Sequence, residues 1–174
     1  MPLRIDATLL VVIWLFALGT YRRLPDSFPI HFDLAGNADG FAERGTAGFV
    51  LWLLLPTTAT LLSLFMRWAA RAGWKNPHLW NVPHKKQFVA LSPERRAPAQ
   101  GVLAEAMAWL TLLCSALLAT LEWLIYVSAR AAHMPAMPTT VLLFVFVVVI
   151  VVYGHRSSGR ARKAIEEAVR DSPV

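Results

Sequence analysis

Four long apolar runs dominate this chain and limit what it can fold into. They cover residues 5–21, 47–66, 103–129 and 134–154. An α-helix of roughly 20 mostly apolar residues is needed to cross a hydrocarbon core of about 30 Å. The second and fourth runs reach that length without a charge, whereas the first is short and Glu122 interrupts the third. The pattern predicts one all-α domain, an integral membrane four-helix bundle.

The overall composition supports the membrane class. Of the 174 residues, 56% are hydrophobic and 16% are charged, whereas soluble domains have about 25% charged residues. The net charge of +6 does not indicate nucleic-acid binding, because the basic residues cluster beside the ends of the apolar runs. We therefore expect the lipid bilayer as the first partner and no nucleic acid.

The distribution of basic residues predicts the orientation. If both termini are cytoplasmic, 13 of the 17 Lys and Arg residues lie inside and 4 lie outside. The positive-inside rule therefore places the loop 67–102 and the tail 155–174 in the cytoplasm, and the loops 22–46 and 130–133 outside. Basic residues of the long inner loop are expected at the membrane surface: Arg67, Arg71, Lys75, Lys85, Lys86, Arg95 and Arg96.

The first outward loop is expected to form a short structured cap. Pro25 and Pro29 favour extended or turn backbone. Residues 29–33 alternate apolar with polar, as a half-buried strand does, and residues 36–40 are rich in turn formers. An extended segment followed by a turn is the prediction for this loop.

Other local signals concern the helices and the inner loop. Pro56 predicts a kink in the second span, and Ser92 followed by Pro93 predicts the start of a short helix. The inner loop around Trp80 is expected to be irregular and to lie against the membrane interface. Charges four residues apart in the tail predict that the fourth helix continues beyond the membrane. The first helix is expected to be retained, and Trp14 and Trp52 to pack inside the bundle.

The candidate site consists of ionisable residues near the outer mouth of the bundle. They are His31, Asp33, Asp39, Glu122 and His133. Ionisable groups in membrane segments are functional candidates, since a charge there costs several kcal/mol. Convergence of these side chains would allow metal binding, proton transfer or recognition of a polar ligand.

A purely structural interpretation of these residues is the stronger alternative. Asp33 and Asp39 would then cap turns, His31 would bond a backbone carbonyl, and Glu122 would reach the headgroups. No metal or phosphate motif is present in the sequence, so we assign no metal ligand, no catalytic residue and no cofactor. Ser63 and Ser115 are expected to bond their own helices, and the lone Cys114 to pack in the core.

One stretch resembles a known family. Residues 24–33 read Leu-Pro-Asp-Ser-Phe-Pro-Ile-His-Phe-Asp and are followed by Gly36, Asp39 and Gly40. This stretch resembles the N-terminal domain of unknown function in SdpI-like immunity proteins, and residues 81–85 and 91–96 resemble their cytoplasmic loop more loosely. The resemblance implies a multi-pass protein of the bacterial cytoplasmic membrane. In relatives it implies protection against a secreted toxin and sequestration of a repressor.

Three functional hypotheses follow. The leading one is a non-enzymatic membrane protein that binds a peptide, toxin or partner protein through its outward loop, in an immunity or signalling role. The second is a membrane enzyme or transporter component using His31, Asp33 and Glu122 with or without a metal. The third is a structural subunit of a membrane complex, for which an oligomer would be expected.

Overall fold

The computed structural model describes residues 2–33, 35, 37–131 and 136–170, with only the backbone for 136–139. The chain is mostly helical and carries one small sheet. Its elements in order are α1 (Pro2–Thr20), η1 (Tyr21–Arg23), β1 (Ser27–Phe32), β2 (Ala38–Glu43), α2 (Thr46–Trp52), α3 (Leu54–Lys75), η2 (Pro77–Leu79), α4 (Lys85–Ala90), α5 (Pro93–Ala131) and α6 (Ala136–Arg170).

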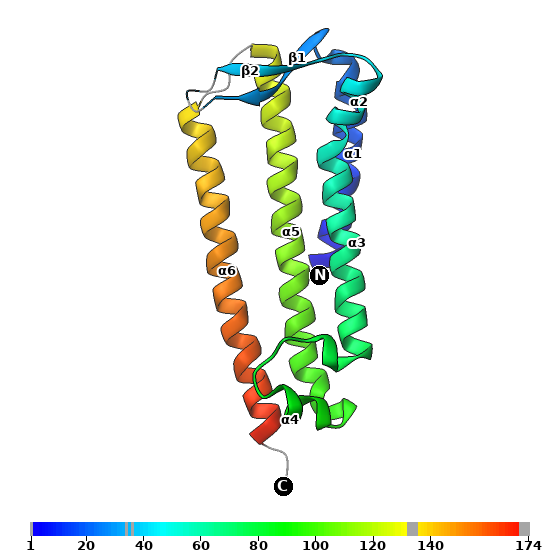
Figure 1. Cartoon of the computed structure of the whole chain (residues 1–174), viewed down its shortest axis with the longest axis vertical. Coiled ribbons are helices and arrows are strands. Elements are labelled where there is room, and N and C mark those ends of the chain that lie inside the picture. Colours follow the sequence, from blue (N-terminus) through cyan, green and yellow to red (C-terminus); the bar gives the residue numbers. More distant parts are fainter. Residues whose placement is uncertain (1, 34, 36, 132–135, 171–174) are drawn as a thin grey trace.

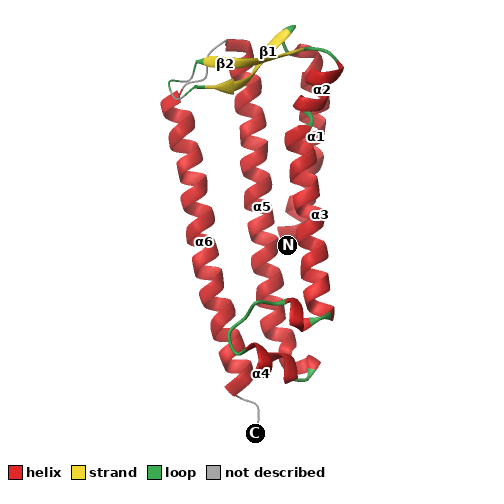
Figure 2. Cartoon of the chain, viewed as in Figure 1, coloured by secondary structure: helices red, strands yellow, loops and turns green. Residues whose placement is uncertain are grey.

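Helix α5 is the central element of the molecule. Helices α1 and α3 pack on it and on each other, and α6 packs along its other side (Figure 1). The strands β1 and β2 lie across one end of the helices, which we call the hairpin end. The opposite end carries α4 and the C-terminus and is called the loop end (Figure 2). The arrangement is therefore a three-helix cluster with α6 attached to α5.

Among the described residues, three helices are long and apolar enough to cross a membrane: α1, α5 and α6. A fourth candidate is the bent pair α2 and α3, whose axes differ by 43°. The bend confirms the predicted kink. Pro56 has no N–H to donate to the carbonyl of Trp52, four residues earlier. The helix breaks at Leu53, between the end of α2 at Trp52 and the start of α3 at Leu54.

The sequence predicted a short helix starting at Pro93, and this prediction is wrong. The helix runs 39 residues without interruption and includes the whole third apolar run. Pro98 lies in its second turn, where little of the helix precedes it. The fourth helix continues to Arg170, as predicted, and its Arg162 Nε donates to Glu166 Oε1 at 2.7 Å.

The predicted cap is an antiparallel hairpin with two register irregularities. Phe28 pairs with Ala42 and Pro29 with Phe41, but His31 pairs with Gly40 and Phe32 with Ala38. The expected simple alternation is wrong. Phe28 and Pro29 are both buried, whereas Ile30 is 44% exposed. Extra residues in each strand act as β-bulges, which change the direction in which side chains point.

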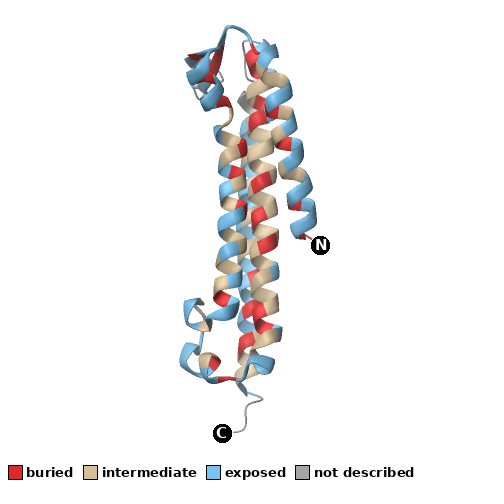
Figure 3. Cartoon of the chain, turned by 90° about the vertical axis from the view of Figure 1, so that its right-hand side faces the viewer, coloured by how far each residue is buried: buried red, intermediate tan, exposed pale blue. Residues whose placement is uncertain are grey.

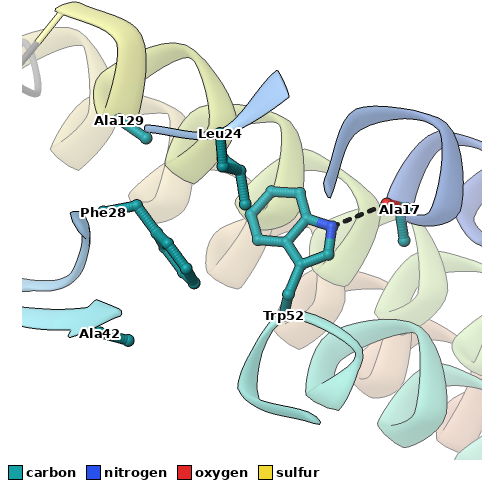
Figure 4. Close-up of a cluster of buried hydrophobic side chains, with 6 residues drawn as sticks. All are labelled: Ala17, Leu24, Phe28, Ala42, Trp52 and Ala129. Carbon is teal, nitrogen blue, oxygen red and sulfur yellow. Dashed lines mark hydrogen bonds between the residues drawn. The ribbon is translucent and has the colours of Figure 1, made fainter. Parts of the chain in front are cut away.

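A small hydrophobic core fixes the hairpin to the helices. Phe28 packs edge-on against Trp52, with ring centroids 6.2 Å apart, and both side chains are buried (Figure 4). The indole Nε1 of Trp52 donates to the carbonyl of Ala17 in α1 at 2.9 Å. Trp52 thus packs inside, as predicted, and Trp14 also reaches a neighbouring helix by donating to Thr60 Oγ1 at 2.9 Å. Contacts with the hairpin-end residues of α1 and α2 therefore fix the position of the hairpin.

The loop end has a second core. The stretch around Trp80 was expected to be irregular, and residues 80–84 are, but η2 and α4 flank them. Phe88 of α4 is fully buried and packs with Leu91, Ala99 and Ile165. Gly73 makes room for the ring of Trp80, because a Cβ at Gly73 would lie 2.5 Å from Trp80 Cε2. The loop therefore packs onto the ends of α3, α5 and α6, while outward helix faces remain exposed (Figure 3).

Candidate functional site

The hairpin brings two of the predicted site residues together. His31 Nδ1 and Asp39 Oδ1 lie within hydrogen-bonding distance of each other, with side chains 71% and 48% exposed. Both residues lie at the bulged part of the sheet, where Gly40 faces His31 across the strands. Asp39 therefore pairs with a histidine instead of capping a turn, and His31 does not use a backbone carbonyl for this bond.

Asp33 shapes the turn of the hairpin. Its Oδ1 accepts the backbone N–H groups of Ala35 at 2.9 Å and Asn37 at 2.8 Å. Its Oδ2 accepts the side-chain amide of Asn37 at 3.2 Å. These contacts match the structural interpretation of Asp33, since an aspartate bonding its own backbone two residues on is a common turn device.

Glu122 is not part of the hairpin site. Its side chain is 1% exposed within the helices, so it does not reach out to headgroups. Neither carboxyl oxygen has a hydrogen-bond partner among the residues that the structure describes. The predicted convergence of Glu122 with His31 and Asp33 is not found, and His133 lies outside the described residues. The described part of the chain also holds no group of three His, Cys, Asp or Glu suited to a metal.

Sequence reasoning missed a buried polar centre at Asp6. This carboxylate of α1 is completely buried and accepts hydrogen bonds from three side chains of two other helices. Ser63 Oγ of α3 donates to Oδ2 at 2.6 Å, and Ser115 Oγ of α5 donates to Oδ1 at 2.8 Å. Arg67 Nη2 donates to Oδ2 at 3.1 Å. The expectation that Ser63 and Ser115 bond only their own helices is therefore wrong.

Two of the polar residues share one face of α5. Ser115 and Glu122 are seven residues apart, which is close to two full turns. Ser115 faces α1 through its bond to Asp6, so Glu122 lies on the same side of α5. One turn further, Tyr126 contacts Phe16 and Trp52, with ring centroids 5.4 and 6.5 Å away. An aromatic layer therefore lies between Glu122 and the hairpin.

The predicted membrane-surface residues are distributed over three helices at the loop end. Arg67, Arg71 and Lys75 belong to α3, Lys85 and Lys86 to α4, and Arg95 and Arg96 to α5. Arg67 and Arg96 make specific contacts within the fold. Arg67 binds Asp6, and Arg96 Nη1 donates to the carbonyl of Val89 at 2.7 Å.

A cavity of about 250 Å³ adjoins the Asp6 centre on the loop-end side. It lies between α3 and α5 next to Leu3, in the first turn of α1. Its lining is mostly apolar, and Arg67 and Arg71 supply the charged groups. No sequence pattern predicted this cavity, because its wall is made by residues from three segments that are distant in the chain.

Comparisons with known proteins identify one segment of the chain. Residues 8–56, which comprise most of α1, the hairpin and the bend before α3, match the family described as Domain of unknown function (DUF1648). The chain is 24% identical over 148 residues to an uncharacterized protein of Archaeoglobus fulgidus, covering 82% of this chain and 78% of the relative. No solved structure matches. The N-terminal segment, with its hairpin, is thus similar to a recognised domain of unknown function.

Proposed function

We propose that this chain is a non-enzymatic, SdpI-like multi-pass protein of the cytoplasmic membrane that binds a peptide or partner protein through its hairpin. Four apolar helical segments support the membrane part of this proposal. The bias of basic residues toward the loop end supports an outward hairpin. The DUF1648 match covers the hairpin itself.

One observation carries the binding proposal: the hairpin exposes recognition groups on a rigidly held support. His31 and Asp39 form a polar pair, and Ile30 and Phe41 are 44% and 58% exposed. Phe28 and Trp52 fix the same strands from beneath. Preorganised surfaces bind with a smaller ordering cost than flexible loops do. The exposed side chains of Ile30 and Phe41 beside this polar pair suit a peptide with mixed apolar and polar character.

The backbone of the hairpin offers a second mode of contact. The sheet has two strands in the described part of the chain, so no third strand pairs with either outer edge there. An extended peptide recognises such an edge by main-chain hydrogen bonds and gains specificity from alternate side chains. A secreted peptide toxin is an occupant of this kind, which fits an immunity role.

A complementation assay tests this function. Cells lacking the chain are challenged with a panel of envelope-acting peptides and complemented with wild type, His31→Ala or Phe41→Ala. We expect wild type to restore resistance and both hairpin variants to fail at equal membrane levels. Lys86→Ala, an exposed change at the opposite end, serves as the matched control. Full resistance with both hairpin variants, or no sensitised strain at all, would refute the protective role.

A second candidate function is a transporter component. It is favoured by one observation, the two carboxyl side chains of Asp6 and Glu122 buried inside apolar helices. Buried carboxyl groups in membrane segments commonly serve proton or ion pathways. In this case Glu122→Gln would abolish activity in a folded protein and His31→Ala would not, the reverse of the pattern expected for hairpin binding.

A further inference from the structure

The cavity at the loop end arises from the unequal lengths of three helices. Helix α1 begins at Pro2, and its N-terminus lies well short of the loop end that α3 and α5 reach (Figure 1). Next to this first turn, α3 and α5 border an open space of about 250 Å³. Small side chains widen it from both sides, since Ala70 belongs to α3 and Ala104 and Ala108 belong to α5. The result is a half-open apolar groove.

The charge of this groove is positive. Arg67 is neutralised by Asp6, but its Nε is buried without a partner among the described residues. Arg71 also lines the groove, and no ion pair to it occurs in the described part of the chain. The acid nearest to Arg67, Asp6, already accepts Ser63, Ser115 and Arg67. One full positive charge and one unused donor therefore remain beside an apolar wall.

The groove is accompanied by tryptophans. Trp74 lines it and is exposed, and Trp68 is exposed on the same helix. Tryptophan is enriched at the level of lipid headgroups. The groove also lies beside the first turn of α1, the first apolar helix. The apolar part of the helices therefore extends from the groove toward the hairpin end, and the polar loop end lies on its other side.

We propose that this groove binds one anionic phospholipid of the leaflet at the loop end. The phosphate contacts the guanidinium groups of Arg67 and Arg71, and an acyl chain lies along Met66, Ala70 and Ala108. The proposal requires that the chain spans a membrane, but it is independent of what the hairpin binds.

The charge and the apolar lining of the groove disfavour two other occupants, a zwitterionic lipid and a small soluble anion. A zwitterionic lipid would bring a cationic headgroup beside Arg71, and the residues described around the groove include no acid to receive it. A small soluble anion would leave the apolar walls uncovered, although these form most of the lining. A phospholipid with net negative charge satisfies both the arginines and the walls.

Native mass spectrometry of the full chain in detergent tests the proposal. The probes are phosphatidylglycerol, phosphatidylcholine and inorganic phosphate. We expect phosphatidylglycerol to bind at least about five-fold more tightly than phosphatidylcholine, and phosphate not to bind. Arg71→Gln should reduce that preference about five-fold, because one basic residue near an anionic headgroup contributes on the order of that factor. Lys75→Gln, an exposed residue outside the groove, should leave it unchanged.

Steric variants provide an independent arm. Ala104→Leu and Ala70→Leu fill the groove from opposite helices, and each should remove bound phosphatidylglycerol. Thermal unfolding in the same detergent checks that at least one of them is folded, and phosphatidylglycerol should raise the melting temperature of wild type but not of the leucine variants. Equal affinity for the two lipids, equal behaviour of Arg71→Gln and Lys75→Gln, or full lipid binding by a folded leucine variant would overturn the proposal. Binding of phosphate alone would show a soluble-anion site instead.

Discussion

Asp6 connects three helices through a single carboxylate. Ser63 and Arg67 reach it from α3 and Ser115 from α5, so removal of its side chain leaves a guanidinium and two hydroxyls unmatched at once. Breaking a buried ion pair by removing one partner costs roughly 3 kcal/mol or more. A single hydroxyl bond inside a helix bundle contributes about 1 kcal/mol or less.

Asp6→Ala should therefore lower the stability by about 3 kcal/mol, and Ser63→Ala or Ser115→Ala by about 1 kcal/mol or less. Thermal or denaturant unfolding in detergent measures the difference. Thr8→Ala is the control on the same helix, because Thr8 is exposed and bonds only the carbonyl of Arg4. An Asp6→Ala protein as stable as the Thr8→Ala protein would contradict the role given to this centre.

Glu122 shows the opposite situation, a buried carboxyl without a hydrogen-bond partner among the described residues. A buried polar group without a hydrogen bond costs about 1–3 kcal/mol. Replacement by a leucine of similar size removes that cost, so Glu122→Leu should raise the melting temperature. Scanning calorimetry or fluorescence-monitored unfolding measures it, with Leu121→Met at the neighbouring position as control. A strongly destabilised Glu122→Leu protein would show that the carboxyl makes an essential contact.

Among the polar residues, the sequence predicted the observed hydrogen-bonding role where the partner is close in the chain. The turn role of Asp33 was among the expected alternatives, because its donors are two and four residues away. The Asp6 centre joins residues 57 and 109 positions apart. Its one available signal was an acid in the first apolar run together with an arginine just after the second.

At the scale of elements, the docking of the inner loop depends on a close approach between Gly73 and Trp80. In a helix interior, Gly→Ala is favourable by about 1 kcal/mol when the methyl group has space. A Cβ at Gly101 of α5 would meet no described atom within 4 Å, whereas a Cβ at Gly73 would lie 2.5 Å from the indole. The same substitution should therefore have opposite effects at the two sites.

Gly101→Ala should raise the melting temperature. Gly73→Ala should lower it or leave it unchanged, because the clash with Trp80 offsets the higher helix propensity of alanine. In addition, Gly73→Ala should increase protease cleavage within residues 76–92, because Trp80 is pushed off α3. Limited proteolysis followed by mass spectrometry measures this. Equal protection of the loop in both variants would show that the Trp80 contact does not hold it.

Element lengths were partly predictable from the sequence. Apolar runs located all four helical segments, since length and hydropathy are local properties. The merging of the Pro93 helix with the third run was not predicted, because Ser92 and Pro93 mark where a helix starts and carry no information on where it ends. The bulges at Ile30 and Asp39 were also missed, since strand register is set by pairing with the opposite strand.

At the scale of the whole molecule, α6 differs from the other long helices. It packs along α5 and α4, and much of its remaining surface is an exposed apolar face containing Val141, Val145, Val148 and Val152. This spacing of three and four residues follows one side of a helix. Such a face suits lipid or a neighbouring subunit equally, and both are consistent with a multi-pass membrane protein.

The path of the chain places the hairpin and the basic loop at opposite ends (Figure 1). Long helices run between them, and the charged residues predict that the loop end is cytoplasmic. The proposed hairpin function depends on this orientation, because the hairpin must meet external peptides.

Thiol accessibility in intact cells tests this orientation most directly. Cys114 is replaced by alanine, and a new cysteine is placed either at the hairpin turn by Asn37→Cys or at the loop end by Lys86→Cys. We predict that a membrane-impermeant maleimide labels Asn37→Cys in intact cells and Lys86→Cys only after permeabilisation. Labelling of Lys86→Cys in intact cells, with Asn37→Cys protected until lysis, would contradict the proposed orientation.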